Sequence, residues 1–409
     1  MKRNLSTLTL LFAALTAAFA QRNIAVKVTN NSKNDLKAVP VVIDLAKYGI
    51  EVKSALVTLN GKEIPSQLDD LDTDGRIDEL CFVTDLGKKE SLSFNVRLDE
   101  TGKPRQYEAR TFAEMLLANK GGKAKNKQTM FINSISACRG YNTYGALHHH
   151  GPAFENEFIA FRLYFDHRQT VDMYGKRRKG LEIKDTQFYP DSKQLADGYG
   201  DDVLWVGNSF GLGALRGWDG TAPVMFDDTD FRAMRVVASG PVRAIVEVED
   251  KNWNTGNAGK EPVYMTTRYS VYAGRRDCFV DIRFNKPASG YLFATGVINV
   301  KGSEELSDKH GLRGCWGTDW PVALKDSAGH KPETVGLAIR IPERYIVSEL
   351  PADKDNYAFV VGNADDGLHY NITFASDNET FGYHSAKEWF GYLKEWKKQL
   401  ESDVTVTCD

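Results

Sequence analysis

The sequence lacks several features that would point to common classes of protein. It has 52 basic and 55 acidic residues and a net charge of -3 at pH 7, so the basic excess of a nucleic-acid-binding protein is missing. Its five cysteines are scattered, with no CxxC pair and no zinc spacing, and no disulfide can be assigned. After the N-terminus, no run is apolar enough to cross a bilayer. We therefore expect no nucleic-acid partner and no membrane insertion.

The N-terminus has the pattern of a secretory signal peptide. The basic start MKR precedes a mostly apolar run over residues 5–19, and small residues at 18 and 20 form a cleavage site. Gln21, rather than a cysteine, follows the expected cut, so a lipid anchor is not expected. We predict that residues 1–20 are removed and that the mature protein is soluble and periplasmic or secreted.

What is present is mainly the pattern of β-strands. Between residues 21 and 100, "NIAVKVT" and "SLSFNVRL" alternate apolar and polar residues, and Asn60-Gly61 is a typical hairpin turn. This predicts a small N-terminal β-sandwich-like region. Residues 101–129 are interpreted as a connector that could hold a short helix around residues 113–119.

Residues 130–409 form the larger part. Long alternating segments such as "VRAIVEVED" and "VYMTTRYSVYAG" predict an antiparallel β-scaffold. Only the end, "SAKEWFGYLKEWKKQLES", is typical of a helix, with Ser385 as N-cap and Glu388 completing a capping box. The predicted fold class is all-β with one C-terminal helix. Aromatic residues at 11% and 35 glycines fit such a fold, and aromatic faces also suit sugar rings.

The stretch "DDLDTDGRIDEL", Asp69 to Leu80, is unusually acidic and lies between two strand-like segments. A helix–loop–helix calcium site starting at Asp70 would need a glutamate at its twelfth position, where Cys81 stands. Two interpretations remain: a charged hairpin turn at Asp74-Gly75, or a structural calcium site. Its ligands would be Asp70, Asp72, Asp74 and Asp78. No cofactor is expected to be required for catalysis.

The segment from Arg139 to Asp185 holds the densest group of residues that could do chemistry. It contains "HHHGPAFENEFIAFRLYFDHR", with four of the eight histidines, and the basic "GKRRKG" turn. Imidazoles, carboxylates and phenols near one another are the usual components of acid–base catalysis. The candidate catalytic residues are His149, His150, Tyr144, Glu157, Arg162, Lys176 and Asp202. The candidate substrate-binding residues are Arg168, Tyr174, Trp205, Trp218 and Trp316.

Each candidate also has a structural interpretation. A histidine can be satisfied in the core, Arg162 and Arg168 can pair with Asp166 or Asp172, and a tryptophan is more often core than ligand contact. His149 and His150 would point to opposite sides of an extended chain, which disfavours a shared metal ion. The glycines of "GNSFGLGALRG" are not a nucleotide fingerprint because no helix pattern follows, and we expect them to permit close backbone approach.

The segments "HHHGPAFENEFIAFRLYFD", "DDVLWVGNSFGLGA" and "SGPVRAIVEVE" resemble an exported Bacteroidetes family catalogued as domain of unknown function 4861. The acidic "DLDTDGRIDELCFVTDL" resembles a hairpin of that family. The "GPVRAIVEVE … YSVYAG" meander is similar to the supersandwich of the galactose mutarotase-like group, which includes mutarotases, polysaccharide lyases and glycosidase domains. Members of the family tend to be encoded beside pectin-degrading enzymes, so the resemblance implies an acidic oligo- or polysaccharide as partner.

Several functions fit these observations. We expect an exported carbohydrate-active enzyme, most specifically a lyase that cleaves uronate-containing glycans by β-elimination, with an arginine or Lys176 at the carboxylate, His149 or His150 as base and Tyr144 or Tyr174 as acid. Glycoside hydrolysis would instead need two carboxylates, for example Glu155 or Glu157 with Asp201 or Asp202. Esterase, mutarotase and non-catalytic glycan-binding functions also remain open.

Overall fold

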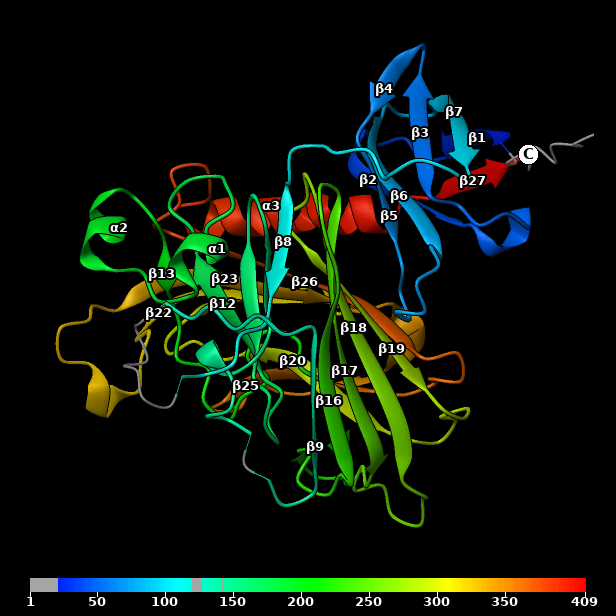
Figure 1. Cartoon of the computed structure of the whole chain (residues 1–409). Coiled ribbons are helices and arrows are strands. Elements are labelled where there is room, and N and C mark those ends of the chain that lie inside the picture. Colours follow the sequence, from blue (N-terminus) through cyan, green and yellow to red (C-terminus); the bar gives the residue numbers. More distant parts are fainter. Residues whose placement is uncertain (1–20, 120–126, 142) are drawn as a thin grey trace, which may run out of the picture.

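The computed structural model describes residues 21–119, 127–141 and 143–409, so the predicted signal peptide lies outside the described residues. Within these ranges the strands form five antiparallel sheets, arranged as a small N-terminal β region beside a larger layered body (Figure 1). None of the described helices is long and apolar enough to span a membrane.

The small N-terminal region consists of two sheets that face each other. Five strands lie in the order β27 (Val404–Cys408), β1 (Gln21–Asn30), β7 (Ser91–Asp99), β3 (Ser54–Leu59) and β4 (Lys62–Ile64). Three more lie in the order β2 (Leu36–Asp44), β6 (Glu79–Leu86) and β5 (Ser66–Asp69), with a 3₁₀ turn at Ala46–Tyr48. Alternate residues such as Val26, Phe82 and Phe94 meet in one buried cluster, because successive strand side chains point to opposite faces.

The larger body is built on a nine-stranded sheet. Its order is β21 (Glu304–Ser307), β22 (Leu312–Asp319), β23 (Glu333–Arg340), β26 (Leu368–Ser376), β19 (Cys278–Phe284), β18 (Val263–Tyr272), β17 (Arg243–Trp253), β16 (Phe231–Ser239) and β9 (Ser134–Cys138). Residues such as Met234, Val246 and Tyr269 point from one face into the main core. We call this the inner face, and the opposite one the outer face.

Two five-stranded sheets lie against the inner face of the nine-stranded sheet. One has the order β13 (Asp201–Asp202), β12 (Val171–Gly175), β11 (Ala160–Leu163), β10 (Ala153–Asn156) and β8 (Thr111–Glu114). The other has the order β15 (Pro223–Val224), β14 (Arg216–Trp218), β20 (Phe293–Ile298), β25 (Asn356–Val361) and β24 (Ile346–Glu349). Phe154, Phe161 and Phe293 join the same core as the nine-stranded sheet, so apolar burial holds the layers together.

Three α-helices and three further 3₁₀ turns complete the described chain. They are α1 (Ile183–Thr186), α2 (Ser192–Ala196), α3 (Ala386–Leu400), and the turns His148–His150, Leu324–Asp326 and Glu343–Tyr345. Trp389, Leu393 and Trp396 of α3 pack on the outer face, where Leu312 and Trp316 meet them. Figure 1 shows α3 as the long red helix.

The all-β fold class, the N-terminal β region and the C-terminal helix are confirmed. The helix considered around residues 113–119 is not formed: Thr111–Glu114 is strand β8, because pairing with β10 outweighs local helix propensity. Ser385 does cap α3 by accepting from the Glu388 N–H at 3.3 Å, but the Glu388 carboxylate accepts from His384 rather than closing a capping box. The C-terminal strand β27 pairs with β1, so the last residues complete the N-terminal sheet.

The close backbone approach predicted for the glycine-rich segment is confirmed at two positions, Gly211 and Gly217. Gly211 has φ +57°, and a Cβ there would lie 2.1 Å from the Val171 carbonyl oxygen. A Cβ at Gly217 would lie 2.0 Å from the Thr255 carbonyl oxygen. No other residue fits either contact without moving backbone, since real Cβ atoms do not come so close.

Replacement of Leu393 by alanine should test the packing of α3 on the outer face. The side chain is fully buried, so Leu393→Ala should lower the free energy of unfolding by about 3 kcal/mol through lost burial and the cavity left behind. Denaturant titration measures the loss, and Lys394→Ala on the exposed side of the same helix is the control. Equal stability of the two variants would contradict this packing.

Candidate functional site

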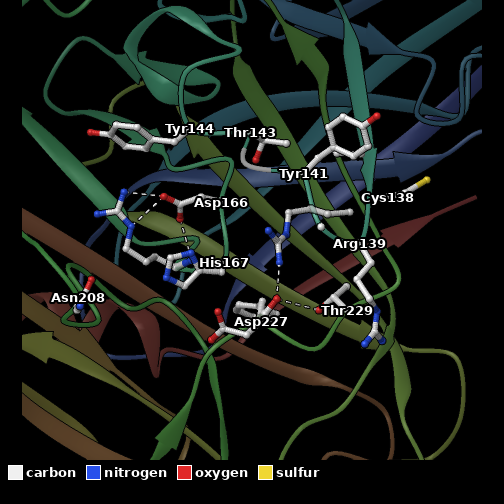
Figure 2. Close-up of a pocket in the computed structure, with 15 residues that line it drawn as sticks. Cys138, Arg139, Tyr141, Thr143, Tyr144, Asp166, His167, Asn208, Asp227 and Thr229 are labelled. Carbon is white, nitrogen blue, oxygen red and sulfur yellow. Dashed lines mark hydrogen bonds and ion pairs between the residues drawn. The ribbon is translucent and has the colours of Figure 1, made fainter.

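A cavity of about 620 Å³ lies where the end of β9, the β11–β12 hairpin and the loop before β16 meet. Figure 2 shows Asp166, His167 and Asp227 toward the middle of the view, with Tyr141 and Tyr144 nearer its edges. The lining residues are Ala137, Cys138, Arg139, Gly140, Tyr141, Thr143, Tyr144, Asp166, His167, Arg168, Asn208, Phe226, Asp227, Thr229 and Arg232. The lining is rich in charged and phenolic groups, which suits a polar ligand.

The tip of the β11–β12 hairpin supplies three of these residues in a row. Asp166 accepts a hydrogen bond from the Arg168 N–H at 2.8 Å, which is the local turn that aspartate favours. The same carboxylate accepts from Arg168 Nε at 2.8 Å and Nη2 at 2.6 Å. The Phe226 N–H donates to the His167 carbonyl oxygen at 3.0 Å. The hairpin tip is therefore fixed against the opposite wall, and Arg168 is held in one orientation.

Tyr144 and His150 form an aromatic stack next to this tip. Their ring centroids lie 3.8 Å apart with an interplanar angle of 7°, and His150 Nδ1 donates to the Tyr144 carbonyl oxygen at 2.8 Å. The Arg168 guanidinium lies 5.0 Å from the Tyr144 ring centroid and 4.7 Å from that of Tyr164. These cation–π contacts leave Arg168 between two phenol rings as part of the cavity wall.

Gly151 explains why His150 lies beside the hairpin. A Cβ at Gly151 would be 1.6 Å from the Leu163 carbonyl oxygen, so the chain passes the hairpin at backbone contact distance. The Phe165 N–H then donates to the His150 carbonyl oxygen at 2.8 Å. A segment some fifteen residues upstream of the hairpin tip is brought to it in this way.

A buried charged network lies behind the Tyr164 ring. Arg162 lies between two aspartates, with Nη2 at 2.7 Å from Asp172 Oδ2 and 2.8 Å from Asp202 Oδ2. The Tyr164 hydroxyl donates to Asp172 at 2.8 Å. Burial, and then the nearby Asp172 carboxylate, raise the pKa of Asp202 well above its usual value. We call these four residues the Arg162 network, and through Tyr164 it supports Arg168.

The three arginines of the cavity are all engaged by acids. Arg168 pairs with Asp166, Arg139 pairs with Asp228 and Asp230 at 2.7 Å each, and Arg232 pairs with Asp250 at 3.1 Å. In the hydrogen bonds described, Arg168 and Arg232 use Nε and Nη2, so Nη1 of each is left for solvent or ligand. The wall can therefore offer guanidinium N–H groups without losing its own support.

Among the imidazole and carboxylate groups of the lining, two have no hydrogen bond from their side chains to any residue that the structure describes. They are the exposed imidazole of His167 and the exposed carboxylate of Asp227. Both belong to loops rather than strands, as is common for residues that contact ligands. Neither group is held by a hydrogen bond within the described residues, so each can turn toward a ligand.

The three consecutive histidines point in three directions. His148 meets the edge of the Tyr189 ring at 5.4 Å, His149 Nε2 lies 3.3 Å from Glu114 Oε1, and His150 stacks on Tyr144. His149 and His150 have φ of +43° and +70°, an uncommon conformation for non-glycine residues. Burial lowers the pKa of His148 and His150 to about 4 and that of His149 to about 3, so all three are neutral near pH 7.

Among the residues predicted from sequence, five gather at this site. Tyr144 and Arg168 line the cavity, while His150, Arg162 and Asp202 stand directly behind its wall. His149 lies deeper, with a fully buried side chain on Glu114. The remaining predicted residues lie elsewhere.

Glu157 and Lys176 have structural contacts outside the cavity. Glu157 forms an ion pair with Arg110 and accepts from the Gly274 N–H at 3.0 Å. Lys176 is fully buried, is paired with Glu155 and donates to the Asn156 carbonyl oxygen at 2.6 Å. These contacts join loops and strands rather than facing a cavity.

The four predicted aromatic contacts are also outside the lining. Tyr174 is buried and donates to the Gly200 carbonyl oxygen at 2.8 Å, and Trp218 packs with Phe210. Trp316 lies under α3. Trp205 is 44% exposed, and its backbone N–H donates to the Trp320 carbonyl oxygen at 2.8 Å. Residue type alone did not show which aromatic rings face solvent.

The acidic turn connects β5 to β6, as the strand–turn–strand interpretation predicts. Carboxylate oxygens of Asp70, Asp72 and Asp78 lie within 4.8 Å of one another, whereas Asp74 is not part of that group. Asp70 accepts from the Thr73 N–H at 2.7 Å, and Asp78 from the Leu71 N–H at 2.6 Å. The turn thus stabilises itself through its own backbone, and the calcium site stays a prediction. Within the described chain no other such group of potential metal ligands forms, the histidine triplet included.

Several lining residues were missed from sequence: Tyr141, Asp166 and His167 as site residues, Asn208, Asp227 and Arg232. One signal was available. The polar "DHRQ" between the apolar "FRLYF" and "VDMY" marks a hairpin tip, and loops carry functional groups. Arg232 had no such signal, because it lies in a strand and only its pairing places it at the cavity.

Replacement of Glu114 should reveal its buried proton. Burial raises the pKa of Glu114 from 4.5 to about 8, so the folded state binds this proton more tightly than the unfolded state. Its stabilising contribution is complete below about pH 4.5 and falls as the pH rises through about 8. The Tm of Glu114→Gln relative to the unsubstituted protein should therefore increase from about pH 5 to about pH 9.

Thermal denaturation at several pH values checks this, with the exposed Glu108→Gln as control. A Tm difference that stays constant across this pH range would show that Glu114 is ionised in the folded protein.

Comparison with known proteins gives a family but little else. No curated protein matches the chain. Two solved structures from Enterococcus faecalis align with 94% of it: a protein in the glycosyl hydrolase family 38 at 11% identity and TM-score 0.45, and an alpha-mannosidase at 12% identity and TM-score 0.43. The chain spans about half their length, 47% and 46% respectively. A likeness of this degree assigns no activity.

The comparison with family models is different in kind, because it covers nearly all of the chain. The model described as "Domain of unknown function (DUF4861)" matches residues 28–406, and the chain therefore belongs to this family.

Proposed function

We propose that the protein is a carbohydrate-active enzyme that cleaves uronate-containing, pectin-like glycans by β-elimination in the cavity around His167. The observation that carries the proposal is a pair of groups in a polar cavity of about 620 Å³. The His167 imidazole has no side-chain hydrogen bond to any described residue, and the Arg168 guanidinium is pre-oriented by Asp166. Elimination needs these two components, a base for the proton next to a carboxylate and a cation for the charge that develops on it.

The chemistry can be assigned to groups of the cavity. His167 takes the C5 proton of the uronate, and the electrons of that C–H bond form the C4–C5 double bond as the C4–O bond breaks. The Tyr144 hydroxyl donates a proton to the leaving oxygen. Arg168 and Arg232 face the carboxylate, whose oxygens accumulate negative charge in the enolate-like transition state. Asp166 and the Arg162 network keep Arg168 in position.

Hydrolysis by two carboxylates has less support at this cavity. Among the described residues, only two carboxylates line the cavity, those of Asp166 and Asp227. The Asp166 carboxylate already accepts hydrogen bonds from Nε and Nη2 of Arg168. A hydrolase would need a second free carboxylic acid across the scissile bond. Sugar epimerisation by one imidazole and one carboxylate, His167 and Asp227, is the second candidate, because neither side chain is paired with a residue that the structure describes.

Turnover of polyuronates separates these possibilities. Elimination creates an unsaturated uronate that absorbs in the near ultraviolet, whereas hydrolysis and epimerisation do not. The protein should produce this absorbance from a pectic substrate, and His167→Asn should lower kcat at least about 100-fold through loss of the base.

The matched control is His330→Asn, because His330 is exposed and lies outside the cavity lining. Near-ultraviolet product formation that persists in His167→Asn would overturn the assignment of the base. Reducing ends released without absorbance would favour hydrolysis over elimination.

We also propose that the chain is exported through the signal peptide predicted at residues 1–20 and that it works on glycans outside the cytoplasm. Acidic plant polysaccharides are too large to enter a cell, so an enzyme that cuts them is useful only after export.

A structural calcium ion at the β5–β6 turn is a further proposal that rests on Asp70, Asp72 and Asp78. If calcium binds only the folded turn, a concentration 100 times Kd should stabilise the protein by about 2.7 kcal/mol. The Tm should rise with added Ca²⁺, and the rise should vanish in Asp70→Asn/Asp78→Asn. The control variant Asp326→Asn/Asp366→Asn, at two exposed positions outside the turn, should still show the rise in Tm with added Ca²⁺. An unchanged Tm on addition of Ca²⁺ would leave the turn as an ordinary charged hairpin.

A further inference from the structure

A row of charged residues crosses the outer face of the nine-stranded sheet. Arg235 pairs with Glu247, Glu247 with Arg268, Arg268 with Asp281 and Asp281 with His369 in the register of five neighbouring strands, β16 to β26. Side chains directly opposite each other in register share a face. Four strand spacings of about 4.8 Å give the row a span of roughly 19 Å.

This row lies on a part of the outer face that none of the described helices and strands covers. Helix α3 packs over β22 and β23, where Leu312 and Ala338 are buried. The N-terminal β region covers the ends of the long strands, where Val242 and Tyr272 pack against Cys81. Figure 1 shows this region beside one end of β17 to β19. Between the two, Asp281, Arg283 and His369 are exposed to solvent.

Glu247, the second residue of the row, pairs with three arginines at once. Its carboxylate is fully buried, although it points to the solvent side of the sheet. It accepts from Arg235 Nε at 2.8 Å, Arg268 Nε at 2.7 Å and Arg283 Nη2 at 3.3 Å. The guanidinium groups cover it, and one negative charge meets three positive charges, more than neutralisation of Glu247 requires.

The charge around this cluster is positive. Lys251 and Arg344 also lie on this side, and Arg344 donates to His369 Nε2 at 2.8 Å and not to a carboxylate. Five cations, Arg235, Arg268, Arg283, Arg344 and Lys251, stand against three carboxylates, Glu247, Glu249 and Asp281. The named residues therefore carry a charge of +2 on a chain whose net charge is -3. Tyr264 on β18 is 48% exposed on the same side of the sheet.

We propose that this arginine strip, residues Arg235, Arg268, Arg283 and Arg344, binds an extended carboxylated polysaccharide chain across the outer face. Its span exceeds one sugar ring, its charge complements a polyanion, and fixed guanidinium groups suit carboxylates. The strip is separate from the cavity: Arg232 lines the cavity from the inner face of β16, and Arg235 points to the outer face. The choice of a uronate chain as occupant rests on the proposed function, while the anionic character of the ligand does not.

Binding of polygalacturonate to the full chain tests the strip. Arg283→Gln/Arg344→Gln should bind it about tenfold more weakly than the unsubstituted protein at low ionic strength, and added salt should reduce the difference. Neither residue is fully buried, and Glu247 keeps Arg235 and Arg268 in this variant. The charge-matched control is Lys193→Gln/Lys354→Gln, whose side chains are 87% and 89% exposed away from the strip. Isothermal titration calorimetry measures binding, and Arg283→Gln alone serves if the double variant does not fold.

The outcomes separate this proposal from the catalytic one. If the strip binds the polysaccharide, His167→Asn retains polygalacturonate binding and loses turnover, whereas the strip variant retains turnover of short oligouronides. Binding of polygalacturonate without any turnover would contradict the catalytic proposal and would still support the binding strip. If the strip variant and the control variant bind polygalacturonate with equal affinity, the proposal that the strip binds the polysaccharide is wrong. Equal affinity of the protein for single-stranded DNA of the same charge would overturn its assignment to a polysaccharide.

Discussion

The buried guanidinium of Arg162 is the interaction on which the candidate site depends. It joins β11, which carries it, to β12 through Asp172 and to β13 through Asp202. Removing one partner from such a buried pair typically costs about 3–5 kcal/mol, because a charge is left uncompensated in a region of low dielectric. Tyr164, and through it Arg168, rest on this network. The cavity wall is therefore as rigid as the charge pairing behind it.

Charge is placed differently on the two sides of the nine-stranded sheet. The inner face must be apolar because it packs against two other sheets, so charged groups on that side collect at the rim, where the hairpin tip and the loop before β16 form the cavity. The outer face is only partly covered, by α3 and the N-terminal region. Its uncovered part can carry a charged row such as that containing Glu247. The proposed catalytic cavity and the proposed polyanion-binding strip lie on opposite faces of β16, an arrangement that would let the protein hold a long substrate while cutting it.

Much of the fold could be predicted because strands and helices follow from the local pattern of apolar and polar residues. Period-two alternation gives strands such as β17, where Val246 and Val248 enter the core and Glu247 does not, and helical spacing gives α3. The site was predicted in part: Tyr144 and Arg168 line the cavity, but Lys176 turned out to be a buried structural cation and Trp316 a core residue. Residue type shows which chemistry a side chain could do. It does not separate a site residue from a structural residue, because both roles use the same residue types.

The sequence by itself determined the strand periodicity, the terminal helix, the acidic turn and the presence of a segment dense in ionisable groups. These depend on neighbours within a few positions along the chain. Only the tertiary structure decided which ionisable groups meet. His150 reaches the hairpin because Gly151 permits backbone contact with Leu163, and Arg232 reaches the cavity because β16 pairs with β9. The direction of each buried side chain is set by packing and pairing between distant segments, and that information is spread over the whole chain rather than present in any motif.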